Sequence, residues 1–222
     1  QQMMALLTGR GAQCVDATRV REVSPSRILN GWELKPYAVI HSQFEEVLLL
    51  DCDNVAISNP DYLFEEPEYL RTGAVFWPDF ERLAPERPIW EICGVDYRDE
   101  PEFESGQLLV NKARCWKALQ VTMQMNEYSD FFYSYIHGDK ETFHMAWRRL
   151  GQEYAMPLRE IEAIGGTMCQ HDFRGNRLFQ HRNMDKWKLG GLNRRIPGFE
   201  LESECFAWLE ELQKLWTELS NS

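Results

Sequence analysis

The hydrophobic positions of the chain fall into short runs that predict buried strands. Apolar runs at residues 47–50, 72–79 and 105–112 are each bounded by polar, glycine or proline residues, which is typical of core strands. A further strand is expected at residues 13–17. Two more apolar runs flank the turn residues Arg-Gly-Asn at positions 174–176, so we expect a β-hairpin there.

Between these strands, apolar residues recur every three to four positions and predict helices. Asn111 and Asp139 precede two of them and are suited to N-cap positions, and Gly151 ends the second. Residues 18–31 and 80–104 are rich in charge or proline and predict surface loops. The helices are expected at residues 31–44, 112–125, 130–136, 140–150 and 203–222, with another before Gly9.

Composition limits what the protein can be. Alternating strands and helices, with 44% hydrophobic residues, predict a single α/β domain over residues 1–222. A formal net charge of −11 argues against nucleic acid as a partner, because phosphate binding needs a basic face. No apolar stretch has the length of a membrane span. The six cysteines lack the spacing of a zinc site or disulfide framework, so we expect free thiols and a reducing compartment.

Two carboxylates, Asp51 and Asp53, follow directly on the apolar run at residues 47–50. Burying a charge without a partner is costly, so a pair at a strand end suggests that a positive group binds there. Carboxylate oxygens at this spacing suit Mg²⁺ or Mn²⁺, which keep open positions for phosphates. The alternative is an ordinary turn stabilised by Asp51 and Asn54.

Three other polar segments are candidates for the same site. Residues 104–107, Glu-Ser-Gly-Gln, come directly before a core strand, where glycine would let the backbone approach a sugar, or they form a simple turn. Asp139 lies at a helix start, where it is a candidate for function or for capping. His181 precedes the basic residues Lys186 and Lys188, a local positive charge that suits a pyrophosphate.

Three segments together resemble a known family: "NGWELKPYAVIHSQFEEVLLLDCDNV", "PDYLFEEPEYLRTGAVFWPDFERL" and "DEPEFESGQLLVNKARCWKAL". They are similar to the alpha-mannosyltransferases typified by fungal Golgi alpha-1,3-mannosyltransferases (glycosyltransferase family 71), which have bacterial relatives. The resemblance covers roughly residues 25–157. It implies a GT-A-like fold, in which a mixed nucleotide-sugar-binding sheet is flanked by helices. It also implies metal-dependent transfer of a hexose, with retention of configuration, from GDP-mannose to a glycan or other hydroxyl acceptor.

The resemblance also implies features that lie outside the three segments. A domain of this kind normally begins one strand earlier, so we expect its first nucleotide-binding strand to precede Gln1. The expected compartment is the cytoplasm for a bacterial protein, or the Golgi lumen for a fungal protein with an N-terminal anchor.

A looser resemblance to glycogenin-like transferases implies roles for individual residues. Asp51, Asp53 and His181 would bind Mn²⁺ or Mg²⁺. The donor would be bound by Lys35 near the nucleotide, by Ser105, Gly106 and Gln107 around the sugar, and by Lys186 at the diphosphate. Asp139 would face the anomeric centre. Because the transition state should resemble an oxocarbenium ion, a carboxylate under the ring would stabilise it, and Asp139 and Glu104 are the candidates.

Two rival functions remain at this point. A haloacid-dehalogenase-like phosphatase would use Asp51 as nucleophile and Asp53 as acid and base. That reading requires a later adjacent Asp-Asp pair, which the chain lacks. A non-catalytic sugar-binding module would use aromatic side chains for stacking, with Trp77, Trp90 and Trp116 among the candidates.

Overall fold

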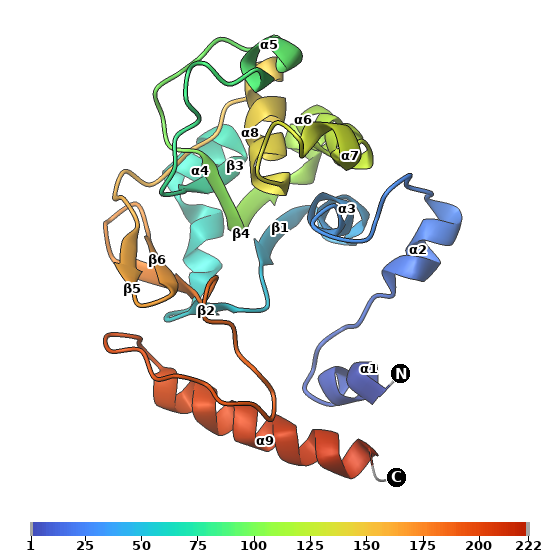
Figure 1. Ribbon diagram of the computed structural model, residues 1–222, viewed down its shortest axis with the longest axis vertical. Helices are drawn as coiled ribbons and strands as arrows, with labels where there is room; N and C mark the ends of the chain where they lie inside the picture. The colour runs from blue at the N-terminus through green and yellow to red at the C-terminus, as the bar shows by residue number, and fades with distance from the viewer. Residues whose placement is uncertain (1, 221–222) are drawn as a thin grey trace.

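The computed structural model describes residues 2–220 and contains two small antiparallel sheets with helices around them (Figure 1). The first sheet has the order β1 (Glu46–Leu50), β4 (Phe103–Asn111) and β3 (Ala74–Pro78). β4 lies between the other two strands, antiparallel to both, and all of it except Asn111 is buried. The apolar runs thus correctly predicted the three strands of this sheet.

The second sheet has the order β2 (Asn54–Ala56), β7 (Arg177–His181), β6 (Thr167–His171) and β5 (Glu162–Ile164). The predicted hairpin is confirmed, because β6 and β7 pair in antiparallel orientation. β1 and β2 are separated by residues 51–53 alone, so these three residues join the two sheets.

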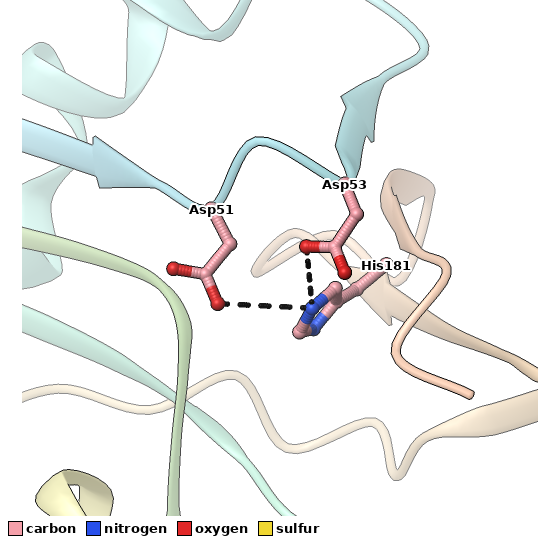
Figure 2. A group of neighbouring side chains, drawn as sticks. All are labelled: Asp51, Asp53 and His181. Carbon is pink, nitrogen blue, oxygen red and sulfur yellow. Dashed lines mark ion pairs between the residues drawn. The ribbon is translucent and has the colours of Figure 1, made fainter. Parts of the chain in front are cut away.

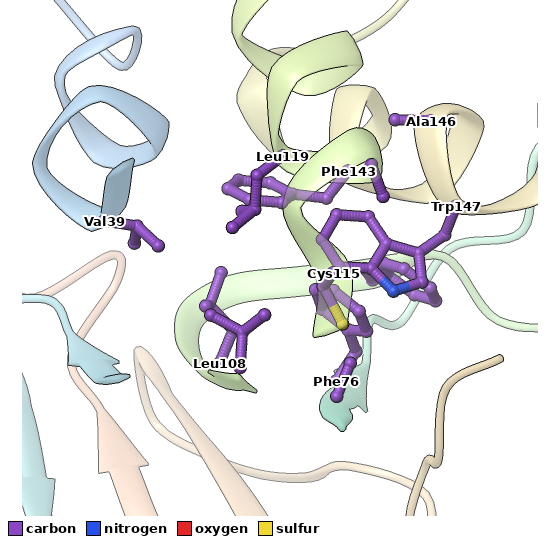
Figure 3. Packing of buried hydrophobic residues seen from close by; sticks show 12 residues of the cluster. Val39, Phe76, Leu108, Cys115, Leu119, Phe143, Ala146 and Trp147 are labelled. Atoms are coloured by element: carbon purple, nitrogen blue, oxygen red, sulfur yellow. The ribbon is translucent and has the colours of Figure 1, made fainter. Parts of the chain in front are cut away.

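Three helices cover one face of the first sheet: α3 (Leu34–His41), α6 (Lys112–Glu127) and α8 (Asp139–Leu150). Figure 3 shows their main core, in which Leu119 of α6 and Phe143 of α8 pack over Leu108 of β4. A second cluster joins the two sheets and includes Trp77 of β3 and Phe179 of β7. The first sheet is therefore held between helices on one side and the second sheet on the other.

The remaining helices are peripheral or short. α1 (Gln2–Thr8) contacts α9 (Glu202–Ser220), and both lie below the rest of the fold in Figure 1. Asn221 and Ser222, the end of the predicted last helix, lie outside the described residues. None of the described helices combines the length and apolar character needed to cross a membrane. The short elements are α2 (Ala17–Val23), η1 (Pro60–Glu65), α4 (Pro67–Thr72), α5 (Ile89–Cys93) and α7 (Ser129–Phe132).

Two local predictions near the N-terminus are wrong. Residues 13–17 form no strand, and the expected loop after them begins with α2. The reason is capping: the Asp16 side chain accepts a hydrogen bond from the Thr18 amide at 2.9 Å and starts the helix. Val15 is well exposed, so no buried face favours a strand.

The mixed sheet that we expected is also not what the structure contains. Both sheets have antiparallel ladders, and a parallel contact occurs as the isolated bridge between Val75 and Ala155. β1 is an edge strand among the described residues. The strand expected before Gln1 stays a prediction.

Candidate functional site

Asp51 and Asp53 lie where the two sheets meet, and each is fixed to a different sheet. The Asp51 amide donates to the Gly106 carbonyl of β4 at 2.8 Å. The Asp53 carbonyl accepts from the Arg182 amide, just after β7, at 3.0 Å. The register of β2 and β7 then places His181 opposite Asn54, beside both carboxylates. The relative position of the two acids therefore depends on both sheets.

Asp51, Asp53 and His181 form a compact group that can hold a metal ion (Figure 2). His181 Nε2 lies 3.1 Å from Asp53 Oδ1 and 3.8 Å from Asp51 Oδ2. One candidate ligand atom from each residue lies within 4.8 Å of the others. Among the described residues, neither ring nitrogen has a hydrogen bond of good geometry. An imidazole facing two carboxylates in this way is a donor set that suits a divalent ion.

The electrostatics of this group reflect its burial. Burial disfavours the charged ring of His181, but the carboxylates of Asp53 and Glu104 outweigh it and raise the pKa of His181 to about 9. Burial also opposes ionisation of Asp53, yet His181 and Lys186 lower the pKa of this carboxyl. Both side chains are therefore charged at neutral pH without a metal.

Gly106 lies inside β4 and leaves room for the imidazole. A Cβ added there would lie 2.3 Å from His181 Nδ1 and 2.8 Å from Glu104 Oε2, too close for either atom to stay in place. The apolar run predicted a strand from residue 105; the structure begins it at Phe103, so residues 104–107 are part of β4 and do not form a turn before it. The space beside Gly106 is filled by His181, which gives the glycine a structural reason of its own.

Glu104 holds the parts of the site together from behind. Its Oε2 accepts hydrogen bonds from the Gly106 amide at 2.7 Å and from Gln107 Nε2 at 2.9 Å, and its Oε1 faces His181 Nδ1 at 3.4 Å. Asn54 Nδ2 donates to Gln107 Oε1 at 2.6 Å. A carboxylate behind an imidazole fixes the orientation of the ring, as is common around metal ligands. Asn54 was not among the predicted site residues, although it directly follows the carboxylate pair.

Lys35 links the carboxylate pair to a third buried acid. Its Nζ lies 2.8 Å from Asp51 Oδ2, 3.1 Å from Ser105 Oγ and 4.0 Å from Asp139 Oδ2. Asp139 does not cap its helix, because Gly138 occupies that position and Glu141 accepts from its amide. Burial raises the pKa of Asp139 to about 6, and the charges of Asp51 and Glu104 act in the same direction, against Lys35.

Lys186 reaches the group from a loop after β7. It forms an ion pair with Asp53 although 64% of its side chain is exposed. The loop is fixed by the fully buried Arg182, which donates to the carbonyls of Asp185 at 2.6 Å and Arg194 at 3.0 Å. The Arg182 guanidinium also stacks on Trp187, 3.8 Å from the ring centre. The sequence indicated the positive charge of this segment but not this anchoring role.

The structure thus brings every predicted site residue into one connected set of contacts. These residues are Lys35, Asp51, Asp53, Glu104, Ser105, Gly106, Gln107, Asp139, His181 and Lys186. Their functional roles stay predictions.

Comparison with known proteins identifies the family. The family described as "Mannosyltransferase putative" matches residues 11–102 and 95–183. The alpha-1,2-mannosyltransferase MNN24 of Candida albicans is 30% identical over 190 residues, covering 66% of this chain and 27% of that protein. The alpha-1,2-mannosyltransferase MNN2 of Saccharomyces cerevisiae is 27% identical over 225 residues, covering 79% and 37%.

The Candida albicans relative MNN21 is 28% identical over 224 residues, covering 78% of this chain and 34% of its own length. The chain spans about a third of the length of these relatives. Their names specify the alpha-1,2 linkage, whereas the resemblance seen in the sequence pointed to alpha-1,3 enzymes. At the level that both share, the chain belongs to this mannosyltransferase family.

Proposed function

We propose that the protein is a metal-dependent retaining α-mannosyltransferase that moves mannose from GDP-mannose to a hydroxyl group of a glycan. The observation that carries this proposal is the buried group of Asp51, Asp53 and His181 in a chain of this family. Because its relatives are named alpha-1,2-mannosyltransferases, we expect the acceptor to be a glycan. We further propose that the two sheets are the core of a GT-A-like nucleotide-sugar site.

The donor set fits Mn²⁺ or Mg²⁺. Two carboxylates and one imidazole converge, and the ring nitrogens lack well-formed hydrogen bonds among the described residues. When bound, such an ion supplies positive charge that offsets the negative charge of the leaving diphosphate.

Two lysines supply further positive charge from opposite sides. Lys186 is exposed, and within residues 2–220 its ammonium group pairs with Asp53 alone, so it can turn toward a diphosphate. Lys35 is largely buried, and its hydrogen bond to Ser105 Oγ fixes its direction. Arg182 holds the loop that carries Lys186 close to Asp53.

The contacts separate the two carboxylates proposed for the sugar-facing role. Both Glu104 oxygens already face partners, Gly106 and Gln107 on one side and His181 on the other, so Glu104 orients the imidazole. Asp139 Oδ2 is buried and has no hydrogen-bond partner among the described residues. We therefore assign to Asp139 the stabilisation of positive charge on the sugar ring as its bond to phosphate breaks.

The test is a thermal-shift panel of GDP, UDP and ADP, each with Mn²⁺ or with EDTA. At a concentration of a hundred times Kd, a ligand of the native state stabilises it by about 2.7 kcal/mol. GDP should raise Tm only with Mn²⁺, and Asp53→Asn should remove the shift. Asp99→Asn is a matched control, because that carboxylate is well exposed and paired with Arg82 away from the site.

A GDP shift that persists in EDTA or in Asp53→Asn would contradict the proposal. A second assay measures GDP released from GDP-mannose with a mannoside acceptor. The non-catalytic alternative predicts sugar binding without metal-dependent release of GDP. The phosphatase alternative gains no support from the family to which the chain belongs.

A further inference from the structure

An exposed tryptophan packs on the glycine that precedes Asp139. Trp32 is 55% exposed, yet one face of its indole ring is packed against the protein. A Cβ added at Gly138 would lie 2.8 Å from Trp32 Cε3, so the indole rests directly on the glycine backbone. The ring also lies 6.1 Å from that of Tyr133, centre to centre. Asp139 follows Gly138, so a well-anchored aromatic surface borders the proposed sugar-facing carboxylate.

The next residue, Glu33, is a buried acid with an unexplained oxygen. Glu33 is only 4% exposed, and its Oε2 has no hydrogen-bond partner among the described residues. A Cβ at Gly31 would lie 3.1 Å from this oxygen, so the carboxylate turns back toward the segment that carries Trp32. Burying a carboxylate oxygen without a partner is costly and calls for a ligand that donates to it.

The negative charges of Glu33 and Asp139 both affect the hydroxyl group of Tyr133. Burial raises the pKa of Tyr133, and the negative charges of Asp139 and Glu33 add to the effect. Both acids are thus close enough to affect the phenol that packs against Trp32. On this side of the site, Glu33 and Asp139 offer acceptor oxygens and Trp32 offers an aromatic face, while the ammonium group of Lys35 is engaged with Asp51. Such a surface favours a neutral ligand rich in hydroxyl groups over a phosphate.

We propose that Trp32 and Glu33 form the acceptor subsite, which binds a hexose of the acceptor glycan. The C–H face of the sugar stacks on the indole, and a sugar hydroxyl donates to Glu33 Oε2. This inference rests on the proposed function. The contacts run from Trp32 through Gly138 and Asp139 to Lys35 and then Asp51. A donor tied to Asp51 and Asp53 through its diphosphate and an acceptor on Trp32 would then be bound at the two ends of this series of contacts, with Asp139 between them.

The experiment titrates methyl α-D-mannopyranoside into the full chain saturated with GDP and Mn²⁺, followed by saturation-transfer NMR. Trp32→Ala should weaken binding about tenfold, the equivalent of one aromatic stacking contact. Glu33→Gln should weaken it about threefold, because a neutral amide oxygen is a poorer acceptor. The GDP–Mn²⁺ thermal shift should be unchanged in both. Trp208→Ala is the matched control, since Trp208 is 54% exposed and lies on α9.

Several results would overturn the inference. One is a wild-type protein that binds GDP with Mn²⁺ but does not bind the mannoside. Another is a loss of mannoside binding that is equal in Trp32→Ala and Trp208→Ala. Displacement of the mannoside by GDP-mannose but not by GDP would assign Trp32 to the donor sugar instead. If the GDP–Mn²⁺ shift is absent while mannoside binding still depends on Trp32, the proposed transferase function fails and the hexose subsite stands.

Discussion

Two places in the fold gather buried carboxylates, and they differ in how these groups are satisfied. In the candidate site, Asp139 Oδ2 and both ring nitrogens of His181 have no well-formed hydrogen bond among the described residues. Near the start of β4, Lys140 Nζ lies 2.6 Å from Asp79 Oδ2, 2.5 Å from Glu102 Oε2 and 3.3 Å from Glu141 Oε1. The second place, which we call the Lys140 cluster, leaves none of its buried described oxygens without a partner.

The contrast separates a structural role from a binding role. A buried acid whose oxygens are all engaged stabilises the fold through its partners, whereas buried polar atoms that make no hydrogen bond are candidates for binding a ligand. The Lys140 cluster ties the end of β3, the start of β4 and the first turn of α8 together around one ammonium group. Burial alone does not distinguish the two places, because the carboxylates are buried in both. They differ in whether each buried polar atom has a hydrogen-bond partner.

The sharpest test of this contrast is Lys140→Met. The change leaves three carboxylates without their shared cation in a largely buried place, which should cost about 3–5 kcal/mol of unfolding free energy. Urea denaturation followed by circular dichroism measures it. The GDP–Mn²⁺ thermal shift of the remaining folded protein should be retained. A variant that folds as well as wild type but no longer binds GDP would move the cluster into the binding site.

Asp139→Asn, in contrast, should stabilise the fold. Burial raises the folded pKa of Asp139 to about 6, above the unfolded value of about 3.9, so the ionised carboxylate destabilises the fold at pH 7.5. The amide should therefore stabilise the protein by roughly 1–3 kcal/mol at pH 7.5. This gain should fade as the pH falls through about 6, where wild type takes up its proton, and vanish below the unfolded pKa.

Urea titrations at pH 7.5 and pH 5 measure this effect, and mannosyl transfer should fall sharply in the same variant while GDP–Mn²⁺ binding persists. Loss of stability at pH 7.5 would make Asp139 a structural residue like those around Lys140.

Gly106→Ala tests the geometry of the metal group with a smaller change. The added methyl group would displace the imidazole of His181 from the two carboxylates. We expect Mn²⁺ affinity to fall about 10-fold or more, as for loss of a positioning contact at a metal ligand. Isothermal titration with Mn²⁺ measures it. In the control, Gly9→Ala, the new Cβ would meet neighbours at ordinary contact distances of 3.4 and 3.5 Å. Unchanged affinity in Gly106→Ala would remove His181 from the metal group.

The local sequence pattern was informative where the physics is local. Apolar runs predicted β1, β3 and β4, and the turn residues predicted the β6–β7 hairpin. Asn111 caps α6 as expected, accepting from the Arg114 amide at 3.0 Å. The error at residues 13–17 also has a local cause, because the capping preference of Asp16 outweighed a weak strand pattern.

What the sequence by itself determined is therefore the three strands of the first sheet, the β6–β7 hairpin, the longer helices, and the placing of Asp51 and Asp53 at the end of a strand. Only the tertiary structure decided that His181 faces them, because this depends on β7 pairing with β2 in the register Asn54 to His181. It also decided that Glu104 orients the ring and that Glu33 keeps an unpartnered oxygen. No periodicity encodes such contacts, since they arise from the order in which strands pair and from which buried atoms then find partners.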